Sequence, residues 1–358
     1  MQKIRVLVVE DSLTVRRLLV DVLGSDPAFE VVAEAENGQQ GVDMCRLLRP
    51  DVITLDMHLP VMDGVSATEH IMGHFPTPIL IVSSSTNRGD LFKTYDALAA
   101  GAVDVLEKPT GQEDDGVWEK KFLAAVKLVS RIRVITHLRA RLGSVGRAAP
   151  AVLESPSLPA PRAGAGGCSL LAIGASTGGP GALVDVLREV PNNLQLTVLI
   201  VLHIDEPFSS AFAEWLSNQT SHSVAYAVGG EPLASPAKGR VLMAAPGRHL
   251  VARAGRLSLS SEPERHSCRP SVDVLFESLA VECANQTVAC LLTGMGRDGA
   301  SGLLALRRAG AYTIAQDEAT SVIYGMPREA VLLGAAQSIL PLSQIGAAMV
   351  RLATRTGA

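Results

Sequence analysis

Short apolar runs alternate with amphipathic segments in the first third of the chain. Five runs are too apolar for strands with one face in water, so they predict a parallel sheet that is covered on both faces: IRVLVV, EVVAEA, DVITL, PILIV and AVDVL. Between the first two, apolar side chains follow the i, i+3, i+4, i+7 spacing of a helix with one buried face: Val15, Leu18, Leu19, Val22 and Leu23. This alternation predicts an α/β domain. A longer helix is expected over residues 117–142.

The pattern breaks at residues 143–168, where 18 of 26 residues are Gly, Ala, Pro or Ser, a composition typical of a linker. Beyond it the alternation resumes with five further predicted strands, LLAIGA, TVLIVLH, RVLMAA, TVACLLT and AYTIAQ. Helices are expected to begin near Pro180, Pro207, Val272, Gly299 and Met326. The chain is therefore divided into a first α/β domain (1–125), a helical extension and linker (126–168) and a second α/β domain (169–358).

Composition limits the classes of function. The chain has 358 residues, which favours two domains, and 47% of them are apolar, enough for two cores. Its net charge of −4 lacks the positive footprint that nucleic-acid binding or adsorption to an anionic membrane requires. We expect neither a nucleic-acid partner nor direct membrane insertion.

Location and cysteine content add two expectations. No apolar run reaches the roughly 18 residues of a membrane helix, and the N-terminus lacks a signal-peptide pattern, so a cytoplasmic protein is expected. The five cysteines, Cys45, Cys168, Cys268, Cys283 and Cys290, include no CxxC pair. We interpret them as reduced and mostly buried thiols.

Polar residues follow four of the first five predicted strands. Glu10 and Asp11 follow the first strand and Asp56 the third, while Ser83 ends the fourth. Lys108 follows the fifth. Ligands bind at the carboxyl ends of parallel strands, and three converging carboxylates suit Mg²⁺. Such a site could neutralise a phosphoryl group on Asp56, and the side chains of Ser83 and Lys108 could bind the phosphoryl oxygens.

Four of these segments, VVEDS, TLDMHLPVMDG, IVSSS and EKP, resemble the response-regulator receiver family over residues 1–125. The resemblance implies a flavodoxin-like fold in which Asp56 accepts phosphate from a histidine kinase. It also implies that Glu10, Asp11, Asp56 and the backbone carbonyl of His58 hold Mg²⁺. Ser83 and Lys108 would sense the phosphoryl group.

The receiver segment departs from its family at one position and allows a simpler interpretation at others. Many receivers carry a switching aromatic residue where this chain has Val105. Taken singly, an Asp after a strand often caps a helix, and Lys108 before a proline could be a solvated loop charge. The side chain of His58 is expected to be solvated and not to bind metal.

The strand LLAIGA leads into GASTGGP, a glycine-rich turn that presents Ser176 and Thr177. No Lys-Ser or Lys-Thr follows, which argues against a P-loop, and the glycine spacing argues against a dinucleotide site. A nucleophilic serine remains. His203 closes the next predicted strand and Asp298 follows TVACLL, which makes a Ser-His-Asp triad plausible. Taken singly, His203 could be a satisfied core or loop histidine, and Asp298 could be the N-cap of the helix near Gly299.

The segments IGASTGGP, RPSVDVLF, LTGMGRDGASG and TIAQDEATSVIYGMPREA resemble the catalytic domain of the CheB family of chemotaxis methylesterases over residues 169–355. The resemblance implies a Rossmann-like domain that hydrolyses glutamyl γ-methyl esters of chemoreceptors, releases methanol, and deamidates receptor glutamines, with no cofactor for the ester step. Ser176 would be the nucleophile, His203 the base and Asp298 the orienting acid. The backbone N–H of Met295 would be an oxyanion donor, and Thr177 would support the imidazole. The receiver would occlude this site until Asp56 is phosphorylated by the kinase of a chemosensory array.

The segment around His203 differs from its family, which commonly has Gln-His-Met-Pro where this chain has Leu202, His203, Ile204 and Asp205. The receptors served, and whether the output is motility or another behaviour, therefore stay open. Two other functions remain as alternatives. One is a phospho-switched protein that docks receptors with little or no turnover, and the other is a kinase-regulated hydrolase of small-molecule esters.

Overall fold

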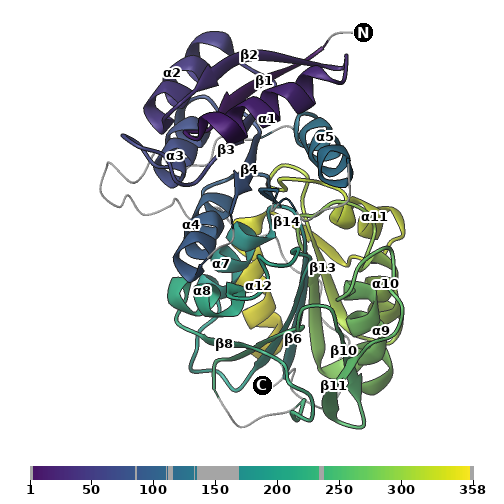
Figure 1. Ribbon diagram of the computed structural model, residues 1–358. Helices are drawn as coiled ribbons and strands as arrows, with labels where there is room; N and C mark the ends of the chain where they lie inside the picture. Colours follow the sequence, from purple (N-terminus) through teal and green to yellow (C-terminus); the bar gives the residue numbers. More distant parts are fainter. Residues whose placement is uncertain are drawn as a thin grey trace. The chain divides into compact units, whose positions relative to one another are not determined.

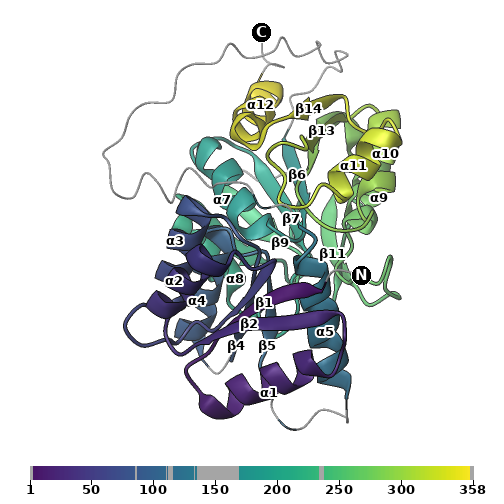
Figure 2. The same ribbon diagram turned by 90° about the horizontal axis from the view of Figure 1, so that it is seen from above.

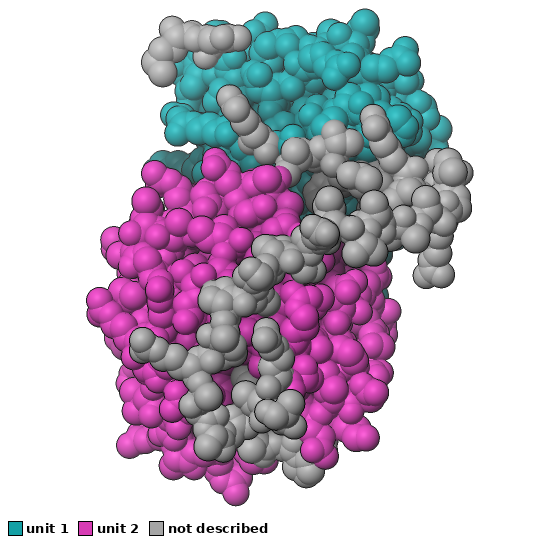
Figure 3. All heavy atoms as spheres, turned by 180° about the vertical axis from the view of Figure 1, so that it is seen from behind, with its two compact units in different colours: residues 1–150 teal, residues 151–358 magenta. Residues whose placement is uncertain are grey.

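The computed structural model describes residues 3–84, 87–109, 111, 116–132, 134, 169–233 and 238–354. The chain forms two compact units, residues 1–150 and 151–358 (Figure 3). The predicted linker, 143–168, lies outside the described residues, and the predicted domain limits at 125 and 168 stay predictions. Among the described helices, none is long and apolar enough to cross a membrane.

Unit 1 contains a five-stranded sheet in which every neighbouring pair is parallel. Its order is that of the flavodoxin-like doubly wound fold: β2 (Phe29–Ala35), β1 (Ile4–Val9), β3 (Val52–Leu55), β4 (Ile79–Ser83) and β5 (Asp104–Glu107). Four residues at the end of β1 and all of β3 are buried. All five strands predicted from apolar runs are confirmed, because both faces of this sheet are covered.

Two apolar clusters fill the faces of this sheet. Three helices border one face (Figure 2): α2 (Gly38–Leu48), α3 (Gly64–His74) and α4 (Arg88–Ala99). The other face packs against α1 (Leu13–Gly24) and α5 (Val117–Val129). Asn37, Asp63 and Asn87 cap the first turns of α2, α3 and α4 by accepting backbone N–H bonds.

The helix predicted over 117–142 is confirmed from Val117 to Val129, a turn follows at 130–132, and residues 133 and 135–142 lie outside the described residues. The helix α5 ends at Val129, and the amides of Ser130, Arg131 and Ile132 bond carbonyls three or four residues back in a closing turn. Its buried face, Trp118, Phe122, Val126 and Val129, ends there too. Beyond the helix, Ile132 and Val134 still pack against the apolar cluster on this face, so the chain leaves the helix but stays in contact with the core.

Unit 2 contains a seven-stranded sheet that is parallel throughout (Figure 1). Its order is β14 (Ser338–Leu340), β13 (Tyr312–Gln316), β12 (Thr287–Leu291), β6 (Leu170–Ala175), β7 (Thr197–Leu202), β9 (Arg240–Met243) and β8 (Ser223–Tyr226). The first strand of the unit, β6, lies between β7 and β12. The order reverses there, and this is where open α/β sheets bind ligands.

Helices cover both faces of this second sheet. One face packs on α9 (Val272–Glu282), α10 (Ala300–Arg308) and α11 (Met326–Leu332) through a large apolar cluster. On the other face, α7 (Gly179–Glu189) packs against α12 (Leu342–Thr354) (Figure 2). The helix expected near Pro207 begins later, as α8 (Phe212–Gln219). The hairpin of β10 (His249–Arg253) and β11 (Arg256–Ser260) was not predicted, and neither were β8, β14 and α12.

Candidate active site and phosphoacceptor site

An acidic cluster lies at the carboxyl end of the first sheet. Glu10 and Asp11 follow β1, Asp56 follows β3, and each offers a carboxylate oxygen within 4.8 Å of the others. Glu10 and Asp56 are buried, whereas Asp11 is exposed. Three hard oxygen donors this close can hold Mg²⁺, and the exposed member leaves a way in from solvent.

Lys108 bridges the two buried carboxylates. Its Nζ lies 2.8 Å from Oε2 of Glu10 and 3.0 Å from Oδ1 of Asp56. Burial and the nearby Asp56 carboxylate raise the pKa of Glu10 to about 7, although Lys108 opposes them. Burial works against the charged ammonium, but Asp56 and Glu10 outweigh it and raise the pKa of Lys108. The ammonium therefore offsets part of a negative charge that a metal ion could also offset.

The remaining predicted phosphoryl-sensing residue is also at this edge. Ser83 ends β4, is fully buried, and its carbonyl accepts the backbone N–H of Lys108 at 3.0 Å. The His58 imidazole does not reach into the acidic cluster but pairs with Asp90 at the start of α4, with 2.8 Å between Nε2 and Oδ1. The sequence predicted a solvated His58 side chain, but in the structure this side chain also pairs with a carboxylate of α4. Val105 is half-buried in β5.

In unit 2, Ser176 follows β6 at the centre of the sheet. Its backbone N–H donates to the carbonyl of Thr293 beyond β12, at 3.0 Å. Gly178 starts α7 with a φ of 77°, a conformation that favours glycine and turns the chain sharply after the serine. A Cβ on Gly294 would lie 2.7 Å from the Cβ of Ser176. Ser176 therefore lies between the end of β6 and the segment that follows β12.

His203 follows β7, directly beside Ser176 in the strand register. The preceding residues Ala175 and Leu202 are partners in the β6–β7 ladder, and the His203 N–H donates to the Ala175 carbonyl at 3.0 Å. The imidazole Nε2 lies 2.9 Å from Oδ2 of Asp298. The fold thus pairs the side chains of His203 and Asp298 and places Ser176 next to His203 along the edge of the sheet.

Asp298 is a buried acceptor at the N-terminus of α9. Besides His203, it accepts the Ser271 hydroxyl and the Val272 N–H, both at 2.7 Å, and the Asp273 N–H at 3.1 Å. The interpretation of Asp298 as the N-cap of the helix near Gly299 is therefore wrong: Gly299 itself is the N-cap of α10, and the carboxylate points to α9 instead. A carboxylate in this position is favoured by the helix dipole.

These contacts shift the pKa values of Asp298 and His203 in opposite directions. Burial opposes ionisation of Asp298, but the hydrogen bonds from His203, Ser271 and Val272 outweigh it and lower the pKa of the carboxyl. Burial likewise opposes the imidazolium, but Asp298 and Cys268 outweigh it and raise the pKa of His203 to about 9. Because Asp298 stays ionised, it accepts the Nε2–H of His203, and Nδ1 is the ring nitrogen left for other chemistry.

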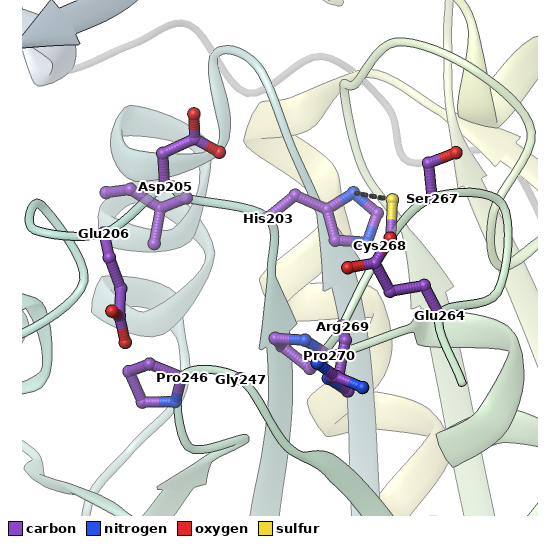
Figure 4. Close-up of a pocket in the computed structure, with 11 residues that line it drawn as sticks. His203, Asp205, Glu206, Pro246, Gly247, Glu264, Ser267, Cys268, Arg269 and Pro270 are labelled. Carbon is purple, nitrogen blue, oxygen red and sulfur yellow. Dashed lines mark hydrogen bonds between the residues drawn. The ribbon is translucent and has the colours of Figure 1, made fainter. Parts of the chain in front are cut away.

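A pocket of about 330 Å³ opens at His203 (Figure 4). Its lining includes Ile204, Asp205 and Glu206, so the segment that departs from the family pattern forms part of its wall. On the other wall, the Sγ of Cys268 lies 3.8 Å from Nδ1 of His203. The sequence analysis did not identify Cys268 and Ser271 as site residues. The only signal was the segment RPSVDVLF, which contains Ser271 and directly follows Cys268.

Two further predicted residues are placed near the site. Met295 follows Gly294, is half exposed, and lines a second pocket of about 610 Å³ with Cys268, Arg297 and Asp298. Thr177 is half-buried, and its carbonyl accepts the Thr293 hydroxyl at 3.0 Å. Their assignments as oxyanion donor and imidazole support stay predictions.

Comparison with protein families agrees with this two-part architecture. Residues 6–115 match the model described as response regulator receiver domain, and residues 171–349 match the model described as CheB methylesterase. A solved structure, the CheB methylesterase catalytic domain of Thermotoga maritima, is 30% identical, with a TM-score of 0.48 over 51% of this chain and 98% of that chain.

Curated relatives resemble the chain along its whole length. A protein-glutamate methylesterase/protein-glutamine glutaminase of Nitrosospira multiformis is 41% identical over 99% of this chain and 98% of its own. One of Anaeromyxobacter dehalogenans is 42% identical over 98% and 97%. The chain belongs to the CheB family of protein-glutamate methylesterases/protein-glutamine glutaminases, with a response-regulator receiver ahead of the methylesterase domain.

Proposed function

We propose that this chain is a phosphorylation-activated hydrolase that removes methyl groups from glutamyl γ-methyl esters of chemoreceptors and deamidates receptor glutamines. The relatives are named for both activities, and the methylesterase model covers the unit that carries Ser176, His203 and Asp298. The single observation that carries the proposal is the 2.9 Å bond from His203 to Asp298 beside the Ser176 turn. Its location in the cytoplasm is a further prediction of the sequence.

The reaction assigns one role to each of the three side chains. Ser176 Oγ attacks the ester carbonyl while Nδ1 of His203 takes its proton, and Asp298 stabilises the imidazolium through Nε2. The proton then passes from His203 to the leaving oxygen, which departs as methanol and leaves an acyl-enzyme. Water, deprotonated by His203, releases the glutamate. With a glutamine substrate the leaving group is ammonia.

Two supporting roles belong to the proposal. The Met295 N–H would donate to the oxyanion of the tetrahedral intermediate, as its place after Gly294 beside Ser176 allows. Thr177, the residue after the nucleophile, would steady the imidazole. Neither role is needed to define the reaction, so each can fail without removing the nucleophile or the base.

In unit 1, Asp56 would accept the phosphoryl group from the histidine kinase of a chemosensory array. Glu10, Asp11, Asp56 and the His58 carbonyl would hold Mg²⁺, and the three carboxylates fit it, since their oxygens lie within 4.8 Å of one another. The ion would offset the charge of the incoming phosphoryl group. Lys108 and Ser83 would then bind phosphoryl oxygens, and the altered receiver would uncover the esterase site.

The alternatives predict different products. A docking protein without turnover would not need the ion pair and buried acceptor network around Asp298, and a hydrolase of small esters would act without a receptor. The discriminating experiment measures methanol release from methylated receptor cytoplasmic fragments by the full chain and by Ser176→Ala. We expect Ser176→Ala to lose at least about 10³-fold in rate while it unfolds at the same temperature. If Ser176→Ala kept a tenth of the wild-type rate, Ser176 would not be the nucleophile. If the full chain hydrolysed simple esters as fast as methylated receptor fragments, the kinase-regulated hydrolase of small-molecule esters would be favoured.

A further inference from the structure

Cys268 brings a thiol to the same ring nitrogen that the proposed reaction uses. Its Sγ lies 3.8 Å from Nδ1 of His203, and the two side chains face one another across the pocket (Figure 4). The residue is half-buried at the pocket wall, so solvent ions reach it. It is not required by any step of the proposed hydrolysis.

The spacing of these two atoms matches a shared tetrahedral metal. Zinc binds thiolate sulfur at about 2.3 Å and imidazole nitrogen at about 2.0–2.1 Å, so two ligands of one tetrahedral zinc lie about 3.5 Å apart. The observed 3.8 Å needs only a slightly wider angle at the metal. No backbone movement is required for the pair to bind one ion.

The far side of the imidazole is already arranged as in a zinc-bound histidine. Such a histidine donates its other ring N–H to a carboxylate, which fixes the tautomer and directs the free lone pair at the metal. Asp298 occupies that position, with 2.9 Å between Oδ2 and Nε2, and three further donors hold it in place. Asp298 therefore orients the ligand and need not bind the metal itself.

The pocket lining favours a cation. Three of its residues carry carboxylates, Asp205, Glu206 and Glu264, against one guanidinium, Arg269. Glu264 is exposed and stands in the chain four residues before Cys268, on the segment that forms this wall (Figure 4). Its carboxylate does not lie within 4.8 Å of ligand atoms of both His203 and Cys268, so this exposed side chain would have to change rotamer to become the third ligand, and water can complete the coordination.

We propose that Cys268 and His203, with Glu264 as third ligand, form an inhibitory site for a thiophilic divalent cation, Zn²⁺. Binding displaces the proton of the Cys268 thiol, and that of Nδ1 where the imidazole is charged, to solvent; the ion then engages the Nδ1 lone pair of His203 with no change of oxidation state. The base then cannot accept the proton of Ser176, so hydrolysis stops until the ion leaves. The inhibitory effect rests on the proposed function, whereas ion binding does not.

The test uses the full-length protein, stripped with a chelator and kept in excess Mg²⁺, with Co²⁺ as a spectroscopic probe for binding and Zn²⁺ as the inhibitor. Thiolate-bound cobalt gives an intense near-ultraviolet charge-transfer band, which the oxygen ligands of the acidic cluster in unit 1 cannot produce. We expect one such band in the wild type, its loss in Cys268→Ser, and at least a tenfold higher Zn²⁺ concentration for half-inhibition in that variant, relative to its own uninhibited rate.

Two controls separate the possible failures. Cys283→Ser removes another half-buried thiol, at the end of α9 and outside the pocket lining, and should behave as wild type. Ser176→Ala should keep the band although it lacks turnover, and Glu264→Gln should weaken cobalt binding. An unchanged band in Cys268→Ser, or wild-type zinc sensitivity in that variant, would overturn the site. A band with no receptor hydrolysis would instead count against the proposed function alone.

Discussion

The Nε2 of His203 donates to Oδ2 of Asp298 at 2.9 Å, and this bond decides which ring nitrogen is left to react. Both residues come after strands of the same parallel sheet, β7 and β12, which are separated by β6, the strand that Ser176 follows. The bond thus spans the strand that carries the proposed nucleophile. Proton transfer through Nδ1 follows from it, and so does the exposure of Nδ1 to a neighbouring thiol.

Replacing Asp298 with Asn tests this bond directly. An amide cannot stabilise the imidazolium and favours the wrong tautomer, so we expect kcat to fall by roughly 10⁴-fold. The variant should also lose stability, because Asp298 accepts three hydrogen bonds from the start of α9. Steady-state methanol release and thermal unfolding measure the two effects separately.

Ser271→Ala is the matched control for the Asp298 variant. It removes the hydroxyl that donates to Oδ1 of Asp298 and caps α9, but it leaves the bond to His203. We expect a loss of stability of about 1 kcal/mol with a much smaller loss of rate. If Asp298→Asn lost stability alone, the carboxylate would be only a structural acceptor.

The raised pKa of His203 predicts an alkaline rate profile. With a pKa of about 9 the imidazole is mostly protonated at neutral pH, and only the neutral ring can act as base. In the presence of a chelator, kcat/KM should therefore rise with pH from neutrality and level off above about 9. The charged ring stabilises the folded chain fully below its ordinary pKa of 6.5, and that contribution is lost as the pH rises through about 9.

Cys268→Ala tests the cause of that shift. Burial lowers the pKa of His203, and the Cys268 side chain raises it together with Asp298. Without the thiol, the rising limb of kcat/KM should move to lower pH, while Cys283→Ser should leave it in place. A rising limb that stayed put or moved to higher pH would show that the thiol does not stabilise the imidazolium.

The close approach of Gly294 to Ser176 can be tested by adding a side chain at position 294. A Cβ there would lie 2.5 Å from Sδ of Met326 and 2.7 Å from Cβ of Ser176, so Gly294→Ala must displace one of them. A shift of about 1 Å at the nucleophile lowers the rate on the order of 10²-fold. We expect a loss in kcat for methanol release, with the far-ultraviolet spectrum of the folded chain unchanged.

Gly296→Ala is the control in the same loop. Its Cβ would meet no atom within 4 Å, although its φ of 87° makes the substitution strained. It should cost stability on the order of 1 kcal/mol without displacing Ser176. Equal losses of kcat in both variants would mean that loop strain, and not contact with the serine, limits the reaction.

The apolar runs predicted the sheets well because strands buried on both faces leave a continuous signal. All six residues of β6 and of β7 are buried, and both were predicted. Three of the missed strands lack that signal: β8 alternates between exposed and buried residues, β14 has three residues, and β11 is only partly buried. The strand β10 is largely buried but was missed as well. Edge strands and hairpins depend on tertiary partners that a run of letters does not show.

Some residues of the candidate site could likewise be predicted from the sequence, and others could not. Residues placed by strand ends, such as Ser176 and His203, could be paired from sequence because parallel strands bring their carboxyl ends to one edge. Cys268 and Ser271 could not, since the segment that carries them reaches His203 and Asp298 from a separate part of the chain. The simpler interpretation of Asp298, as the N-cap of the helix near Gly299, fails for the same reason, because α9, whose N-terminus donates to Asp298, ends 16 residues before it in sequence.

Activation by phosphorylation is predicted to depend on Ser83 and not on Val105. Ser83 is fully buried beside the Asp56–Lys108 pair. Among the residues that the structure describes, its hydroxyl makes only a long 3.4 Å contact with the Ser84 carbonyl, so it can turn to a phosphoryl oxygen. Val105 has no hydrogen-bonding side chain. With a small phosphodonor and Mg²⁺, the activation ratio of methanol release should fall in Ser83→Ala and persist in Val105→Ala.

Asp56→Asn and the fragment 143–358 complete this comparison. Asp56→Asn should show no activation, because it removes the proposed phosphoacceptor, while its basal rate stays that of the unphosphorylated chain. If the receiver occludes the esterase site, the fragment should be faster than the unphosphorylated full chain, and a tenfold difference corresponds to about 1.4 kcal/mol of coupling. A fragment no faster than the full chain would refute occlusion and make the receiver an activator. Full activation of Ser83→Ala would show that Lys108 alone binds the phosphoryl oxygens.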